Sequence, residues 1–206
     1  MVVDPRHKNH MLDASSIDSY KAGYADKLKA TLEAIPSSEI EKIVTAIVEA
    51  AKTGNRIYVA GNGGSAAIAD HLCCDWTKGT HCEGHGTIAS HSLTSNVALY
   101  SAIANDYGFE RVFSTQVGFF GKPGDVLIAI SSSGNSPNII QAVEAAKAQG
   151  MFTAGFSGFK GGKLAEICDA SIYAAIDNYG VVEDAHQAVM HIIAQYVAYH
   201  RDHAPK

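Results

Sequence analysis

Apolar residues recur along this chain with two periods, and these periods predict helices that alternate with short buried strands. Near the N-terminus, apolar positions three and four residues apart predict a helix over residues 13–35, which Pro36 ends. A second helix follows, with Ser37 or Ser38 as its cap, and closes at Gly54. Both helices carry large apolar faces that must be buried, and burial against a partner subunit predicts an oligomer.

The rest of the chain alternates strand and helix patterns. The predicted strands are 56–61, 86–93, 125–131, 152–158 and 170–176. The predicted helices cover about 66–77, 95–106, 109–121, the end of the segment 131–150, and 182–201. Short apolar strands that alternate with helices are typical of a parallel sheet with helices on both faces. One α/β domain over residues 1–206 is therefore expected. Its parts would be a flexible N-terminus at 1–12, leading helices at 13–54 and the core at 55–200.

Composition and charge narrow the class of protein. The chain has 206 residues, of which 47% are hydrophobic and 18% charged, as in a single soluble globular domain. A formal charge of −5 without a run of basic residues argues against a nucleic-acid surface. No apolar stretch is long enough to span a membrane, and the N-terminal segment lacks the apolar centre of a signal peptide. A cytoplasmic location is therefore expected.

Two predicted strands end in loops whose composition suits an anion. Residues 62–65 follow the strand at 56–61, and residues 131–136 close the strand at 125–131. Glycines let the backbone approach an anion closely, hydroxyls donate hydrogen bonds, and the start of the next helix adds partial positive charge. Neither loop fits G-x-x-x-x-G-K-[ST] or G-x-G-x-x-G. Ordinary capped turns would explain either loop alone, but two such loops after two apolar strands favour a phosphate site.

Three motifs together resemble a known family. Residues 61–65 read GNGGS, residues 131–136 read SSSGNS, and AIANDYGF lies between them at 102–109. At this spacing the chain resembles the sugar isomerase (SIS) domain family, and within it the phosphoheptose isomerases, over residues 13–200. The resemblance implies a three-layer α/β/α sandwich around a five-stranded parallel sheet of the flavodoxin-like type. It also implies a homotetramer with active sites at subunit interfaces.

The same resemblance implies a reaction and a set of substrate contacts. Family members convert sedoheptulose 7-phosphate to D-glycero-D-manno-heptose 7-phosphate, which leads to the heptoses of lipopolysaccharide, capsule or other glycoconjugates. In the family, the first loop and an Asn-Asp pair contact the sugar, and the serine loop holds the phosphate. Carried over by position, the substrate-binding residues are Asn62, Gly63, Gly64, Ser65, Asn105, Asp106, Ser131, Ser132, Ser133, Ser136 and Glu183.

A second group of residues offers the chemistry that isomerisation needs. His71 and Asp75 stand four residues apart on the helix after the first loop, so their side chains share a face. The family has His and Glu at these positions, and its last helix has a Gln followed eight residues later by a His. Here the second pair is Glu183 and His191. A carboxylate and a histidine suit the base and acid that move a proton beside a carbonyl. The resemblance thus implies catalytic roles for Asp75 and His191.

These four side chains also imply a metal site, because in the family they can hold zinc. Two imidazoles and two carboxylates suit one zinc or other divalent ion per subunit. The metal ligands would be His71, Asp75, Glu183 and His191. Asp75 is one methylene shorter than glutamate, which sets its carboxylate back by roughly 1.5 Å. Glu183 in place of Gln adds a negative charge, which favours a bound cation. The segment before Glu183 also lacks the basic residue that the family pattern has there. This departure concerns recognition of the sugar rather than of the phosphate.

Alternatives remain open at this point. A second group of possible zinc ligands is spread over residues 71–91, but its adjacent pairs lack the C-x-x-C spacing of a structural zinc site. Its members are His71, Cys74, His81, Cys82, His85 and His91. The four cysteines are otherwise read as free thiols. The family resemblance also allows an isomerase for another sugar phosphate, or a non-catalytic sugar-phosphate-binding regulator such as a replication-initiator-binding protein.

Overall fold

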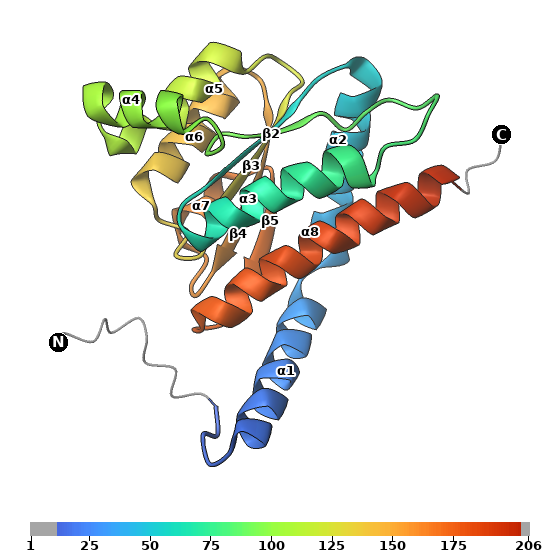
Figure 1. The fold of residues 1–206 in the computed structure, drawn as a ribbon, viewed down its shortest axis with the longest axis vertical. Helices are drawn as coiled ribbons and strands as arrows, with labels where there is room; N and C mark the ends of the chain where they lie inside the picture. The colour runs from blue at the N-terminus through green and yellow to red at the C-terminus, as the bar shows by residue number, and fades with distance from the viewer. Residues whose placement is uncertain (1–11, 203–206) are drawn as a thin grey trace.

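Five parallel strands form one sheet with helices on both of its faces (Figure 1). The computed structural model describes residues 12–202. Within that range the strands are β1 (Ile57–Gly61), β2 (Ser90–Ser92), β3 (Val126–Ser131), β4 (Phe152–Gly158) and β5 (Ala170–Ala174). Their order in the sheet is β2-β1-β3-β4-β5, and every neighbouring pair is parallel. The predicted α/β sandwich is confirmed, and the strand order is the flavodoxin-like one.

The helices that cover the sheet divide into two layers. One layer consists of α2 (Ser37–Thr53), α3 (Gly64–Cys74) and α8 (Tyr179–Asp202). The other consists of α4 (Val97–Tyr107), α5 (Ser114–Phe120), α6 (Pro137–Ala148) and α7 (Gly162–Ile167). Strand β1 shows why both layers form, because Ile57 and Val59 face the first layer while Tyr58 and Ala60 face the second. The continuous apolar runs of the sequence are thus strands that are buried on both faces.

The first helix, α1 (Ile17–Ala34), projects from the body of the domain (Figure 1). Tyr24 and Leu28 pack against a small apolar cluster near the start of α8, whereas Ile17 is 79% exposed. The prediction for residues 1–12 falls, apart from Leu12, outside the described residues. Among the described helices, none has the length and apolar character needed to cross a membrane.

The carboxyl ends of β1 and β3 lie side by side where the chain changes direction across the sheet. From β1 the chain crosses to β2 at one edge, and β3 then returns to the other side of β1 before β4 and β5 follow. Ligands of open parallel sheets bind at such a switch point. Gly61 pairs in register with Ile130, so residues 62–65 and 132–136 leave the sheet next to each other. The two predicted anion loops are therefore neighbours.

Some local predictions are wrong. Ser37 is the first residue of α2 and not its cap, because Pro36 occupies the N-cap position. The predicted strand at 86–93 pairs with the sheet only over the three residues of β2. The predicted helix at 109–121 is divided into a 3-10 turn and α5. Periodicity did not predict α7, whose six residues are too few for a helical pattern to stand out.

His186 of α8 is a titratable group inside the core. It is completely buried, and its Nε2 lies 3.0 Å from the carbonyl oxygen of Ser157 in β4. Burial disfavours the charged imidazolium and lowers the pKa of His186 from its ordinary value of 6.5 to about 4. Because folding favours the neutral ring, this contribution to stability is complete above pH 6.5 and is lost as the pH falls toward 4.

We expect His186→Gln to remove this pH dependence. The lowered pKa corresponds to about 3 kcal/mol of unfolding free energy lost between pH 6.5 and pH 4. The glutamine amide can still donate to the Ser157 carbonyl but does not titrate, so stability should fall less across this range. Urea unfolding over the same pH range measures the difference, with His200→Gln at the exposed end of α8 as control. Parallel stability curves for wild type and His186→Gln would contradict the assignment.

Candidate active site

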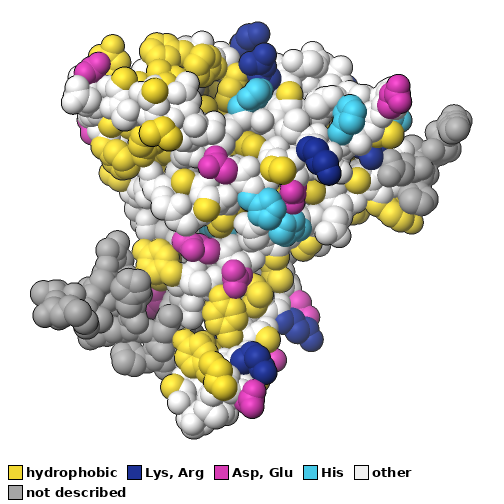
Figure 2. Space-filling view, viewed as in Figure 1, with side chains coloured by type: hydrophobic (Ala, Val, Ile, Leu, Met, Phe, Trp, Pro, Cys, Tyr) yellow, Lys and Arg dark blue, Asp and Glu magenta, His cyan; other side chains and the backbone are white. Residues whose placement is uncertain are grey.

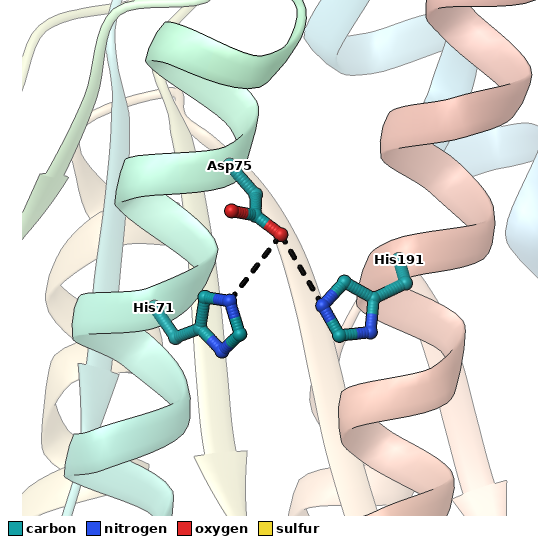
Figure 3. Close-up of side chains that lie close together, drawn as sticks. All are labelled: His71, Asp75 and His191. Carbon is teal, nitrogen blue, oxygen red and sulfur yellow. Dashed lines mark ion pairs between the residues drawn. The ribbon is translucent and has the colours of Figure 1, made fainter.

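Three side chains from two helices converge on one point beside the sheet. His71 lies in the last turn of α3, Asp75 directly follows that helix, and His191 comes from α8 (Figure 3). The Asp75 Oδ2 atom lies 3.4 Å from His71 Nε2 and 3.2 Å from His191 Nε2. The two imidazole rings meet edge to face with their centroids 5.1 Å apart. One carboxylate is thus shared by two histidines.

Trp76 holds the end of α3 against α8. Its buried indole donates a hydrogen bond from Nε1 to the carbonyl oxygen of Met190 at 3.1 Å. Trp76 and Met190 are the chain neighbours of Asp75 and His191, so this bond fixes the two backbones beside the paired side chains. Asp75 also begins a π-helical turn, Asp75–Gly79, that continues α3. Such turns often occur at functional sites.

The three side chains are open to solvent. Their exposed fractions are 48% for His71, 31% for Asp75 and 38% for His191. Figure 2 shows histidine side chains gathered on the surface between α3 and α8, with carboxylates close by. The group is therefore accessible to a small molecule.

Gln187 extends this group, and sequence reasoning missed it. Its Nε2 atom lies 2.6 Å from Nδ1 of His71, the ring nitrogen on the side away from Asp75. Gln187 stands four residues before His191 on α8, so both side chains share one face of the helix. The sequence did contain a signal for Gln187: it stands four residues from both Glu183 and His191, which places all three side chains on one helix face.

Glu183 lies at the other end of the α3–α8 contact. A Cβ atom on Gly64 would come within 2.6 Å of both carboxylate oxygens of Glu183, so the carboxylate packs directly on the start of α3. Burial, with a smaller contribution from Asp184, raises the pKa of Glu183 above its ordinary value. The structure therefore places Glu183 beside the first loop. It does not belong to the three-residue group of His71, Asp75 and His191.

The serine loop after β3 is ordered by its own hydroxyls. Ser131 Oγ donates to Ser136 Oγ at 3.0 Å and lies 3.4 Å from Ser133 Oγ. The backbone carbonyl of Ser132 accepts a hydrogen bond from the last residue of β4 at 2.9 Å. Gly134 has a φ of +67°, and a Cβ atom there would overlap the loop before α7. Of the four serines of this loop that are predicted to bind the substrate, Ser131 thus contacts both Ser133 and Ser136 just before α6.

The first loop is tied to the second by a pair of amides. Asn62 and Asn138 exchange two hydrogen bonds of 2.9 Å, each amide donating to the other. Asn138 is buried in the first turn of α6, and sequence reasoning missed it. Gly63 adopts a φ of +55°, and the buried Ser65 donates its N–H to the Asn62 carbonyl at 3.0 Å. The predicted loop residues are therefore held in one assembly.

The predicted Asn-Asp pair lies elsewhere. Asn105 donates to Asp106 at 2.8 Å, and both side chains are exposed near the end of α4. Figure 1 shows α4 well separated from the crossing of α3 and α8. Within one chain, the structure thus does not join this pair to His71, Asp75 and His191.

The second group of possible zinc ligands is not assembled. Among the described residues, the histidines, cysteines and carboxylates that come close enough to share an ion are His71, Asp75 and His191. The cysteines are free, and burial raises the pKa of the Cys73 thiol to about 12.

We expect Asn138→Ala to destabilise the junction of the two loops. The substitution leaves the Asn62 amide without its partner, which should lower the free energy of unfolding by about 1–3 kcal/mol. Urea unfolding at neutral pH measures this change. Asn105→Ala, on the exposed surface, is the matched control and should change stability by less than about 0.5 kcal/mol. Equal effects of the two substitutions would show that the amide pair does not stabilise the loops.

Comparisons with known proteins identify the family of this chain. The SIS domain family model matches residues 23–158. Phosphoheptose isomerase of Rhodospirillum rubrum is 39% identical over 160 residues, which cover 78% of this chain and 83% of that protein. Phosphoheptose isomerase of a Roseiflexus species is 34% identical over 189 residues, which cover 89% of this chain and 95% of that protein.

Two solved structures show that the fold is similar as well. The phosphoheptose isomerase of Neisseria gonorrhoeae superposes with a TM-score of 0.78 at 31% identity, over 86% of this chain and 95% of that one. The enzyme of Francisella tularensis gives a TM-score of 0.81 at 29% identity, over 89% and 96% of the two chains. The chain therefore belongs to the SIS domain family and, within it, to the phosphoheptose isomerases.

Proposed function

We propose that this protein isomerises sedoheptulose 7-phosphate to D-glycero-D-manno-heptose 7-phosphate, with proton transfer at Asp75 and His191. Membership of the phosphoheptose isomerase family supports the reaction. The observation that carries the assignment of the site is the carboxylate of Asp75, which lies within 3.4 Å of two imidazoles on an accessible surface. A carboxylate and an imidazole in contact are the acid–base pair that an aldose–ketose isomerisation needs.

The serine loop is the proposed phosphate site. Hydroxyls of Ser131, Ser133 and Ser136 cluster at the start of α6, where backbone N–H groups and the helix dipole favour an anion. Ser132 belongs to the same loop, and the amide pair of Asn62 and Asn138 fixes the first loop beside it. A phosphate held here would leave the sugar to extend between α3 and α8.

The spacing along the helices supports a long substrate. Glu183 packs on Gly64 beside the loops, and His191 follows eight residues later on α8. At 1.5 Å per residue, this places the reacting group about 12 Å along the helix from the loop end. A sugar phosphate with its phosphate at one end of the chain and its carbonyl at the other suits such a separation. A seven-carbon sugar 7-phosphate has that arrangement.

In the proposed reaction, Asp75 and His191 divide the proton transfers. The Asp75 carboxylate takes the proton from the carbon next to the carbonyl and returns it to the neighbouring carbon. His191 exchanges a proton with the sugar oxygens. Its Nε2 lies 3.2 Å from the same carboxylate, so both groups can reach one substrate. Gln187 and the α3–α8 packing keep the imidazole of His71 turned toward Asp75.

The same residues fit a divalent metal. One ring nitrogen of each histidine and a carboxylate oxygen of Asp75 all lie within 4.8 Å of one another, and zinc is commonly held by three such protein ligands in catalytic sites. Bound zinc or another divalent ion would polarise the sugar's carbonyl and hydroxyl oxygens. The resemblance also implied Glu183 as a ligand, but its carboxylate packs on Gly64 at the loop end of α3 and lies outside the three-residue group, so it is not proposed as a ligand within one chain.

Another sugar phosphate is the second candidate substrate. The segment before Glu183 carries no lysine or arginine between Ile172 and Glu183, so a sugar whose hydroxyls need a cation there would be recognised poorly. The phosphate site and the acid–base group do not depend on that segment. A purely regulatory role has less support, because a binding protein does not need an acid–base group in its site.

The decisive assay is turnover of sedoheptulose 7-phosphate by the purified protein. We expect Asp75→Ala and His191→Ala to lower kcat by at least about 100-fold, because each removes a proton-transfer group. Treatment with a chelator should abolish activity, and added zinc should restore it. His200→Ala, an exposed histidine outside the three-residue group, is the control and should retain activity.

Other outcomes have distinct meanings. Absence of turnover with retained sugar-phosphate binding would exclude this substrate and redirect the search to another sugar phosphate. Full activity after chelation would exclude the metal. Unchanged kcat in Asp75→Ala would show that the reaction occurs elsewhere.

We also propose that the protein is a homotetramer. Ile192, Tyr196 and Tyr199 form an exposed apolar stripe on α8, with 46%, 49% and 59% exposure, and α1 projects beyond the domain. Apolar stripes of this kind are typical of subunit contacts. A cytoplasmic location stays a prediction from the sequence.

Light scattering should give about four times the chain mass of 21.8 kDa. Ile192→Asp introduces a charge into the stripe and should reduce the assembly size, whereas Ile192→Leu should not. A stable monomer of the wild-type chain would contradict the proposal.

A further inference from the structure

His71 has a polar neighbour at each ring nitrogen. Its Nε2 faces the Asp75 carboxylate at 3.4 Å, and its Nδ1 faces the side-chain amide of Gln187 at 2.6 Å. A neutral imidazole carries one proton, so one nitrogen donates and the other presents a lone pair. The hydrogen-bond partner of Nδ1 therefore decides whether Nε2 carries a proton or presents a lone pair toward Asp75 and His191.

The side-chain amide of Gln187 can form a hydrogen bond with either neutral tautomer of the His71 ring. When its oxygen faces His71, the proton lies on Nδ1, and the lone pair of Nε2 points toward Asp75 and His191. When its NH₂ group faces His71, Nδ1 accepts and Nε2–H donates to Asp75. A half-turn of the terminal torsion exchanges these two arrangements without moving the backbone.

We propose that Gln187 is a positioning residue that selects the His71 tautomer needed to hold a divalent metal through Nε2. This inference rests on the metal site of the proposed function. Gln187 does not itself belong to the group of possible ligands. In the structure its amide nitrogen faces Nδ1; a half-turn of the amide brings its oxygen there, and in that arrangement Gln187 accepts a hydrogen bond from Nδ1–H. Histidines that bind metals commonly donate their second N–H to such a partner, which fixes the ring and its tautomer.

The position of Gln187 suits this role. It lies on α8 midway between Glu183 and His191, four residues from each, and so on the face that meets α3. Trp76 fastens the same two helices through Met190, so the distance between Gln187 and His71 is set by packing rather than by the two side chains alone. A short contact held in this way orients the ring.

The test compares two variants at this position. In Gln187→Leu the contact is lost, and the equilibrium Kd for zinc should rise about 10–100-fold. In Gln187→Glu the carboxylate can only accept, so Nδ1 keeps its proton and the Kd should stay within about threefold of wild type or decrease. Competition with a chromophoric chelator measures zinc affinity directly. The controls are the same two substitutions at Gln195, which is exposed on the same helix. Gln195→Leu tests the loss of a polar group and Gln195→Glu tests the added charge, and both should bind zinc as wild type does.

A second readout reports the tautomer itself. The ¹⁵N shifts of the His71 ring in the zinc-loaded protein should show a protonated Nδ1 in wild type and in Gln187→Glu. Wild-type zinc affinity in Gln187→Leu, or equally weak binding in Gln187→Leu and Gln187→Glu, would overturn the inference.

Its failure can be distinguished from failure of the proposed function. If zinc affinity follows the expected pattern but sedoheptulose 7-phosphate is not converted, the substrate assignment fails and the role of Gln187 stands. If the sugar phosphate is converted but zinc affinity does not depend on residue 187, the role of Gln187 fails and the reaction stands.

Discussion

The contact between α3 and α8 is the constraint on which the candidate site depends. Neither helix carries a complete acid–base group, because His71 and Asp75 belong to one and His191 to the other. The buried Trp76, whose indole donates to the Met190 carbonyl at 3.1 Å, holds the helices together beside the paired side chains. Both helices pack their apolar faces on the same side of the sheet. The hydrophobic core thus sets the geometry of a polar site at its edge.

That constraint also bears on the replacement of glutamate by the shorter Asp75. The family pattern predicts a carboxylate that sits too far back, yet Oδ2 of Asp75 lies within ion-pair distance of both imidazoles. Asp75 stands at the first position of a π-helical turn, where the helix widens. The shorter side chain is therefore accompanied by a local change in the backbone that carries it. In this chain the contacts with both imidazoles are therefore made by an aspartate.

The two ends of the site have opposite electrostatic character. At the serine loop, hydroxyls and a helix N-terminus provide partial positive charge for an anion without any full cation from the loop itself. Toward the histidines, the Asp75 carboxylate provides negative charge between two imidazoles, whereas Glu183 lies at the loop end against Gly64. A phosphate at one end and a cation at the other would each relieve part of this imbalance. An elongated anionic sugar with polarised oxygens at its far end fits that arrangement.

Sequence patterns alone determined the α/β class, the strand segments of the core, the two anion loops and the shared face of His71 and Asp75. These features follow from local periodicity, glycine and serine content, and fixed spacing on a helix, all of which act within a few residues. Tertiary structure alone decided the contacts of Gln187 with His71, of Asn138 with Asn62 and of Glu183 with Gly64. Each joins residues at least 76 positions apart, and only the packing of helices on the sheet brings such residues together. It also separated Asn105 and Asp106 from the histidines within one chain, because the sequence fixes their helix but not the layer in which that helix packs.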